Sequence, residues 1–243
     1  MCENLPHAVV IDLETTGLLK KTDKIIEIGA LKIRNGEVCE TFSRLIDPGF
    51  PLSQSVSELT GITGDMVAGQ PQFAQVADEL EAFLEDDILI GHSITTDFAF
   101  LKKAFVDTKP KGYVFAKKGI DTLRIARTFL PADEKKTLSA ACAHYGFSFS
   151  PHRAVEDAKA NWFLYQKLYE EFGKKEPVMF EPKELVFSVK RDTPIMKKQI
   201  EQLQRLLSEK DLTLPVPIES LTKSRASRVI DRIRNGERED LLG

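Results

Sequence analysis

The sequence predicts an α/β protein in which helices flank a mixed β-sheet and a small helical tail follows at the C-terminal end. Three strand patterns come first, and strand and helix patterns then alternate up to about residue 171. Strands followed by strands mixed with helices are typical of a sheet that has both antiparallel and parallel neighbours. At 243 residues and 42% hydrophobic content, the chain has room for one large domain and an appendage.

The first three strands are expected to form an antiparallel start of this sheet. Residues 7–13 are an apolar, β-branched run that predicts a buried strand, and residues 24–33 predict a second, half-buried one. Asn35-Gly36 then predicts a two-residue hairpin, because both residues tolerate the positive φ that such a loop requires. The third strand is expected over residues 37–46.

Helices and strands alternate in the middle of the chain. Apolar residues at helical spacing predict a helix over residues 71–84, and Ile88-Leu89-Ile90 predicts a strand. A helix over residues 95–106 follows, with Asp97 in its first turn. The other elements expected before residue 172 are two short helices on either side of residues 61–64, a short strand at residues 120–121, and helices ending at residue 129, spanning 137–145 and spanning 154–171.

Beyond residue 171 the apolar periodicity fades and then returns. Leu185-Val186-Phe187-Ser188-Val189 predicts one edge strand, and residues 195–207 and 221–233 predict two helices. The expected organisation is a domain over residues 1–171, a linker or surface strap over residues 172–193, and a small helical module over residues 194–243.

Composition predicts a cytoplasmic protein with free thiols. No apolar run approaches the roughly 20 residues needed to cross a bilayer, and Met1-Cys2-Glu3-Asn4 lacks the start of a signal peptide. The three cysteines are scattered and have no CxxC spacing, which favours a reducing compartment over disulfides or zinc.

The net charge of -3 divides into -6 for residues 1–171 and +3 for residues 172–243. An acidic body is expected where bound cations neutralise a site built of carboxylates.

Five residues predict a nuclease site. Asp12 and Glu14 stand two apart at the end of the first strand, so both side chains project from one face while Leu13 faces away. Such close like charges raise each other's pKa unless a cation lies between them, which predicts a hard divalent metal. Asp97, His152 and Asp157 add two more carboxylates and an imidazole further along the chain.

These residues resemble the DnaQ-like DEDDh 3′→5′ exonucleases over residues 7–171, a family that includes the epsilon proofreading subunit of bacterial DNA polymerase III and the exonuclease segment of PolC-type polymerases. Asp12-Leu13-Glu14-Thr15-Thr16-Gly17-Leu18 is similar to the family's first motif, His92 to Leu101 with Asp97 to the second, and His152 with Asp157 to the third. The resemblance implies a ribonuclease H-like fold. Ser93 and Thr96 depart from the Asn and Phe that the family usually shows, which bears on substrate packing but not on metal binding.

The resemblance also implies cofactors and residue roles. Two divalent metal ions, Mg²⁺ or Mn²⁺, are expected, with Asp12, Asp97 and Asp157 holding the one that activates water and Asp12 bridging to the other. Glu14 would place ions and water. His152 is the candidate general base, because an imidazole pKa of about 6.5 suits proton transfer at cellular pH, and the neighbouring Arg153 is a candidate phosphate contact. The expected substrate-binding residues are Leu13, Thr15, Thr16, Gly17, Gly61, Ile62, His92 and Ser93.

The predicted activity is hydrolysis of phosphodiester bonds at the 3′ ends of single-stranded DNA, which releases nucleoside monophosphates during proofreading or repair. Two alternatives stay open: an exoribonuclease acting on short RNA or tRNA ends, and a catalytically silent nuclease-fold interaction subunit. The family resemblance makes a DNA polymerase a candidate partner. A sliding clamp is another candidate, since residues 211–216 faintly resemble clamp-binding peptides. The cations of the second tail helix predict either phosphate-backbone contacts or a solvated helix face, and they are Lys223, Arg225, Arg228, Arg232 and Arg234.

Overall fold

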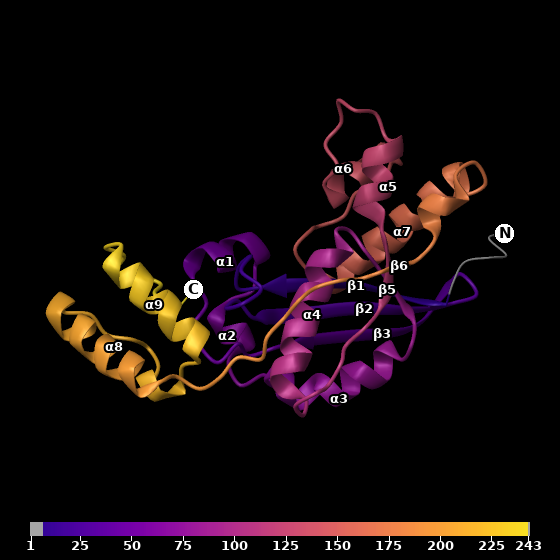
Figure 1. Ribbon diagram of the computed structural model, residues 1–243. Coiled ribbons are helices and arrows are strands. Elements are labelled where there is room, and N and C mark those ends of the chain that lie inside the picture. The colour runs from indigo at the N-terminus through magenta and orange to yellow at the C-terminus, as the bar shows by residue number, and fades with distance from the viewer. Residues whose placement is uncertain (1–6, 243) are drawn as a thin grey trace.

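The computed structural model describes residues 7–242, and within them a six-stranded mixed sheet carries helices on both faces (Figure 1). The strand order is β3-β2-β1-β4-β5-β6. β1 runs antiparallel to β2 and parallel to β4, and β5 runs parallel to β4. The strands are β1 (Ala8–Thr15), β2 (Ile25–Arg34), β3 (Glu37–Leu45), β4 (Ile88–Gly91), β5 (Lys118–Asp121) and β6 (Lys183–Glu184). The predicted α/β fold with a mixed sheet is confirmed.

The antiparallel half of the sheet follows the sequence prediction closely. Asn35 and Gly36 join β2 to β3 with φ values of 54° and 81°, which is the left-handed conformation of a tight hairpin turn. β2 is buried along nearly its whole length, whereas β3 is mostly exposed. This difference places β2 in the interior of the sheet and β3 at its solvent edge.

The other edge of the sheet is formed by β6. The prediction of an edge strand over residues 185–189 is wrong. β6 has only two residues, and they pair with Lys118 and Gly119 at the start of β5. The next residue, Leu185, still donates its N–H to the Lys117 carbonyl, but the chain then runs past the beginning of β5. With no partner strand left, Val186 is 86% exposed and the ladder ends.

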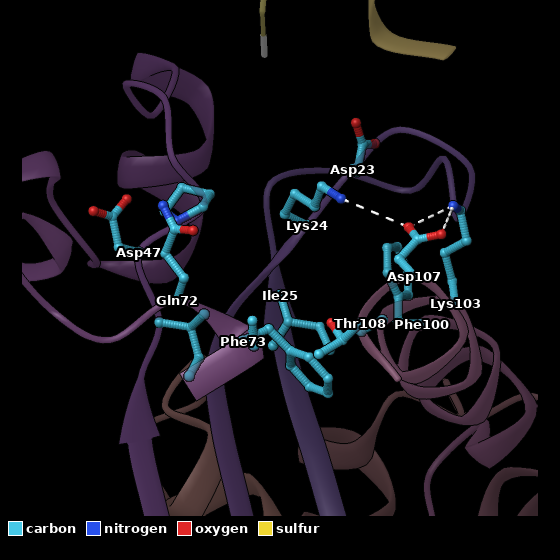
Figure 2. A pocket seen from close by; sticks show the side chains of 14 residues that line it. Asp23, Lys24, Ile25, Asp47, Gln72, Phe73, Phe100, Lys103, Asp107 and Thr108 are labelled. Atoms are coloured by element: carbon cyan, nitrogen blue, oxygen red, sulfur yellow. Dashed lines mark hydrogen bonds and ion pairs between the residues drawn. The ribbon is translucent and has the colours of Figure 1, made fainter. Parts of the chain in front are cut away.

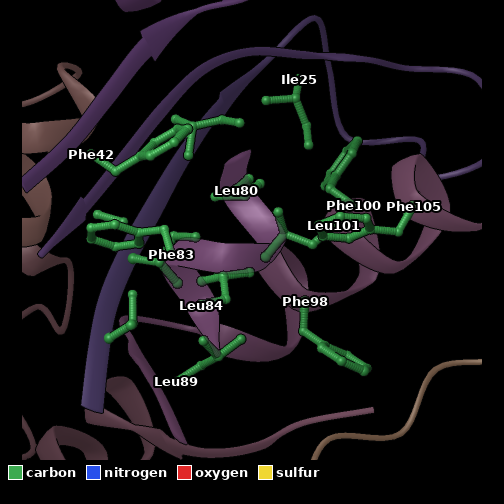
Figure 3. Close-up of a cluster of buried hydrophobic side chains, with 14 of the residues drawn as sticks. Ile25, Phe42, Leu80, Phe83, Leu84, Leu89, Phe98, Phe100, Leu101 and Phe105 are labelled. Atoms are coloured by element: carbon green, nitrogen blue, oxygen red, sulfur yellow. The ribbon is translucent and has the colours of Figure 1, made fainter. Parts of the chain in front are cut away.

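One face of the sheet is covered by α3 (Phe73–Leu84) and α4 (Ile94–Thr108). Their apolar side chains and those of the strands pack into a single buried cluster (Figure 3). Leu80, Phe98 and Leu101 are among its most buried members. This packing holds the first turn of α4, which carries Asp97, against the end of β1.

The other face is covered by α5 (Thr122–Phe129), α6 (Leu138–His144) and α7 (Ala154–Phe172). They pack with the strands into a second cluster, in which Trp162 and Tyr165 stack with ring centroids 5.5 Å apart. A 3₁₀ turn (Pro177–Phe180) follows α7 and joins the same cluster through its last residue.

Gly29 on β2 allows α7 to approach the sheet closely. A Cβ at this position would overlap the backbone of Ala154 and Val155 at the start of α7. Gly29 is also the register partner of Asp12 on β1. The missing side chain therefore brings the first turn of α7, with Asp157, next to Asp12.

The C-terminal helices α8 (Lys197–Lys210) and α9 (Lys223–Arg234) pack on each other around their own apolar cluster, with a 3₁₀ turn (Ile218–Ser220) between them. Phe50 from the main domain also packs against this cluster. Figure 1 shows the tail beside α1 (Gln54–Thr60) and α2 (Gly64–Val67). None of the helices described between residues 7 and 242 is long and apolar enough to cross a membrane.

Candidate active site

Three of the predicted carboxylates meet at the end of β1. Asp12, Glu14 and Asp157 offer oxygen atoms that all lie within 4.8 Å of one another. Asp12 and Glu14 come from alternate positions of one strand, and Asp157 comes from the first turn of α7. Carboxylate oxygens in such a group are ligands that Mg²⁺ and Mn²⁺ prefer.

Asp97 lies beside this group, in the first turn of α4, and is 9% exposed. The backbone N–H of Leu13 donates to its carboxylate. Among the neighbouring charges, that of Asp97 acts most strongly on Asp12. The fourth predicted carboxylate is therefore within electrostatic reach of the cluster, although it is outside the group of three.

Burial and mutual repulsion raise the pKa of each of these acids. Burial is the main cause for Asp12, whose pKa lies well above its usual value, and the charges of Asp97 and Asp157 add to it. Burial raises the pKa of Glu14 to about 7 and that of Asp97 to about 8. Burial and mutual repulsion thus disfavour the ionised forms of all four acids, and a bound divalent cation would offset this effect, so the donor set fits such a cation.

The loop before α7 is fastened to the acidic site by hydrogen bonds. Asp157 accepts the backbone N–H of Arg153 at 3.0 Å, and the backbone N–H of His152 also donates to it. His152 itself has a left-handed backbone with φ of 70° and an exposed side chain. The candidate base thus lies exposed on a loop whose backbone is hydrogen-bonded to Asp157.

Glu27 on β2 is a site residue that the sequence analysis missed. It is 2% exposed and accepts from Arg153 Nη2 at 2.9 Å and from the backbone N–H of Ala154 at 2.9 Å. The sequence did offer a signal for this residue, because Glu27 is an acid between two isoleucines in the apolar pattern of the second strand. Arg153, predicted as a phosphate contact, instead ties the start of α7 to β2, with half of its side chain exposed.

A cleft of about 800 Å³ opens beside the acidic site. Glu14 and Asp97 line it together with four predicted substrate-binding residues: Leu13, Thr15, Thr16 and Gly17. Leu18 and Leu59 also line it and are 79% and 62% exposed, so the cleft has apolar side chains open to solvent. Neither leucine was predicted as a substrate contact, because exposure of a single apolar residue is not visible in a sequence.

The tail forms part of the wall of this cleft through Arg228, Arg232, Glu237 and Asp240. Arg228 forms an ion pair with Asp23, and Arg232 forms one with Glu237 at 2.6 Å. The predicted tail cations are thus not a uniformly solvated face.

Arg225 fastens the tail to the main domain. It is 5% exposed, lies 3.7 Å from the ring centroid of Phe50, and donates to the backbone carbonyls of Thr22 and Leu242. A side chain with these contacts cannot reach a nucleic-acid backbone in solvent. The prediction of a phosphate contact therefore does not hold for Arg225.

Four predicted substrate-binding residues lie outside the lining of the cleft. Ile62 is fully buried with Ile26 and Val67, so its side chain cannot reach a ligand. Gly61 is the left-handed C-cap of α1, with φ of 68°. Neither position lines the cleft, although Leu59 and Thr60 at the end of the same helix do.

His92 and Ser93 follow β4 and make internal contacts. The Nε2 atom of His92 donates to the Lys136 carbonyl at 2.7 Å, and its Nδ1 atom lies 3.1 Å from Thr122 Oγ1. Burial lowers the pKa of His92. The backbone N–H of Ser93 donates to Asp121 at 3.0 Å. Both residues join the ends of β4 and β5.

A smaller cavity of about 170 Å³ shares Phe100 with the cleft (Figure 2). Inside it the Lys103 ammonium donates to both carboxylate oxygens of Asp107, at 2.7 and 2.5 Å. Lys24 lies 3.9 Å from the same carboxylate, and burial lowers its pKa. The charged groups of Lys24, Lys103 and Asp107 in this cavity thus pair with one another.

An acidic cluster at the end of the central strand of a ribonuclease H-like sheet is the arrangement of a nuclease. An exonuclease family model (RNase_T) matches residues 9–165, and the chain belongs to this family. The family membership that the motifs predicted is confirmed.

Two sequence relatives and one solved structure illustrate the match. DNA polymerase III PolC-type of Halalkalibacterium halodurans is 40% identical over 162 residues, which are 66% of this chain and 11% of that protein. DNA polymerase III subunit epsilon of Aquifex aeolicus is 34% identical over 164 residues, 67% of this chain and 80% of that protein. The nuclease domain of 3′hExo, a DEDDh family member bound to rAMP, has the same fold with a TM-score of 0.58 and 22% identity, covering 68% of this chain and 92% of that one. This chain spans about a tenth of the length of its PolC-type relatives.

Proposed function

We propose that this protein is a metal-dependent 3′→5′ exonuclease that releases nucleoside monophosphates from the 3′ ends of single-stranded DNA, in proofreading or repair. The observation that carries the proposal is the group formed by Asp12, Glu14 and Asp157, with Asp97 beside it, at the edge of the cleft. Membership of the exonuclease family supports it.

Asp12, Glu14, Asp97 and Asp157 are the residues that would hold two divalent cations, Mg²⁺ or Mn²⁺. Such ions supply activation of the attacking water and stabilise the departing 3′ oxygen. In the absence of a cation, burial favours the protonated forms of these four acids. A bound cation would favour the ionised forms, which would supply the negative charge that the cation requires.

The protein's own groups then position the substrate and move the proton. Thr15, Thr16 and Gly17 border the cleft beside Glu14, so the terminal nucleotide is expected to lie along them. His152 accepts the proton of the attacking water, since it stands exposed on the loop that Asp157 holds. Without the hydrogen bonds from the loop backbone to Asp157, nothing would hold the His152 imidazole in position to accept that proton.

Partners are also proposals. The PolC-type and epsilon relatives are DNA polymerase III chains, which supports a DNA polymerase as a partner. A sliding clamp has less support, because Leu212, Leu214 and Val216 of the clamp-like segment pack against the tail's apolar cluster. We propose that residues 1–171 act as the catalytic domain, residues 172–193 as a strap and residues 194–243 as a helical module.

The test uses 5′-labelled single-stranded DNA and RNA of one sequence with Mn²⁺, and compares the wild type with Asp12→Asn. We expect a ladder of shortened DNA from the wild type and a rate about 10³-fold lower from the variant, because the metal interactions contribute several kcal/mol to the barrier. Asp86→Asn, at an exposed acid away from the cleft, is the matched control and should retain activity. A ladder on RNA alone would favour an exoribonuclease, and no ladder on either would refute the proposal.

A further inference from the structure

A second groove, here called the basic groove, lies where four segments distant in sequence meet. Its volume is about 510 Å³. The segments are the loop between β1 and β2, α4 through Lys103, the strap after β6, and the first turn of α9. The residues that line it are Lys20, Lys21, Lys103, Phe187, Ser188, Val189, Lys190, Arg191, Asp192, Thr193, Lys223 and Ser224.

Most of the positive charge in the basic groove is free to meet an anion. Within residues 7–242, the ammonium groups of Lys20, Lys21, Lys190 and Lys223 form no ion pair with a carboxylate. Lys21, Lys190 and Lys223 are exposed. A chain with a net charge of -3 thus gathers four unpaired lysines into one concave surface.

Asp192, the carboxylate among the lining residues, is already occupied. Its oxygen accepts from Ser224 Oγ at 3.0 Å and from the backbone N–H of Thr193 at 3.0 Å. Burial acts to raise the pKa of Asp192, but hydrogen bonds from Thr222, Thr193 and Ser224 outweigh it and lower that pKa. Asp192 therefore holds the strap against the start of α9, and its single negative charge offsets only part of the positive charge of the six Lys and Arg side chains that line the groove.

The basic groove and the active-site cleft lie on the two sides of one loop. Leu18 on this loop lines the cleft, and Lys20 and Lys21 line the basic groove. Lys20 also connects the two, because its ammonium lies 5.7 Å from the ring centroid of Phe100, which lines the cleft. The same loop therefore borders both the cleft and the basic groove.

We infer that the basic groove binds the phosphodiester backbone of the substrate strand, on the 5′ side of the terminal nucleotide that lies in the cleft. This inference rests on the proposed function. Lysine ammonium groups on flexible stems suit sequence-independent contacts with successive phosphates, whose affinity depends on salt. The strap and the tail would then take part in substrate binding, with Lys223 as the tail cation that reaches the backbone.

Binding of a fluorescent oligothymidylate of about 20 nucleotides tests the inference by anisotropy in EDTA, where no cleavage interferes. The variant carries Lys21→Ala, Lys190→Ala and Lys223→Ala. Each phosphate contact on a single strand contributes about 0.7 to the slope of log affinity against log salt, so three lost contacts should reduce the slope by about 2. A control with Lys111→Ala, Lys174→Ala and Lys198→Ala removes the same charge from exposed positions outside the groove and should leave the slope unchanged.

Hydrolysis separates this inference from the proposed function. The nitrophenyl ester of thymidine 5′-monophosphate fills only the cleft, so the groove variant should hydrolyse it at the wild-type rate while its KM for the oligonucleotide rises. An unchanged salt slope would overturn the basic groove as a binding site, even with full hydrolysis of the ester. Absence of hydrolysis by the wild type would refute the proposed exonuclease, while the binding slope would still decide the groove.

Discussion

Substitution of Gly29 by alanine is expected to disable the acidic site without touching any of its carboxylates. The new Cβ would lie within 2.5 Å of three backbone atoms of Ala154 and Val155, whereas ordinary contacts begin at 3.4 Å. The start of α7 must therefore move away from β2 by roughly 1 Å. Asp157, three residues into that helix, moves with it. Mg²⁺ requires oxygen ligands at about 2.1 Å, so a carboxylate displaced by this amount no longer coordinates.

We expect kcat of Gly29→Ala to fall by about 100-fold, as is typical of a misplacement near 1 Å. Its unfolding free energy should fall by about 1–3 kcal/mol, which is the usual cost of overpacking. Exonuclease kinetics, Mn²⁺ titration calorimetry and urea denaturation measure these quantities. Gly64→Ala is the matched control, since a Cβ there meets nothing within 4 Å. Wild-type Mn²⁺ affinity and kcat in a folded Gly29→Ala protein would refute the argument that this glycine sets the ligand spacing.

Three further predictions concern charge. Arg153→Ala leaves the buried Glu27 without its main partner, so we expect urea denaturation to show a loss of about 1–3 kcal/mol, and Glu27→Gln in the same protein should recover part of it. Glu14 and Asp97 have pKa values raised to about 7 and about 8, so the folded state binds protons more tightly than the unfolded state and loses stability as pH rises from about 4 to 8. The melting temperature in EDTA should therefore fall as the pH rises from 5.5 to 8.5, and Mn²⁺ should raise it more at pH 8.5 than at pH 5.5. A melting temperature that does not change with pH would contradict the raised pKa values of Glu14 and Asp97. Arg225→Met should lower the unfolding free energy by about 2 kcal/mol, because two carbonyls lose their donor, and an unchanged denaturation midpoint would argue against this anchor.

The central part of the fold was predictable because local signals agree with the tertiary structure. The β-branched run of β1 and the Asn35-Gly36 turn specify their conformations within a few residues of sequence. The edge strand was not predictable in this way. Leu185 to Val189 has the composition of a strand, but the length of β6 depends on where β5 begins, and this is information from another part of the chain.

The same distinction applies to the candidate site. Asp12 and Glu14 share a face by strand geometry alone, and the spacing of His152 and Asp157 suits a loop followed by a helix. The contact between Arg153 and Glu27 joins residues 126 positions apart, so no local pattern could report it. Likewise, nothing in the sequence places the tail along the cleft, because that position depends on surfaces that exist only after folding.

The attachment of the tail has a consequence for how this enzyme can be shortened. Thr22 and Asp23 are almost fully buried, and Arg225 and Arg228 satisfy their oxygen atoms from the tail. A polypeptide cut after α7 would expose these oxygen atoms to water and release the loop that carries Gly17 and Leu18. Truncation would thus alter the wall of the cleft beside the acidic site, and kinetic constants of a trimmed version should not be taken as those of the intact molecule.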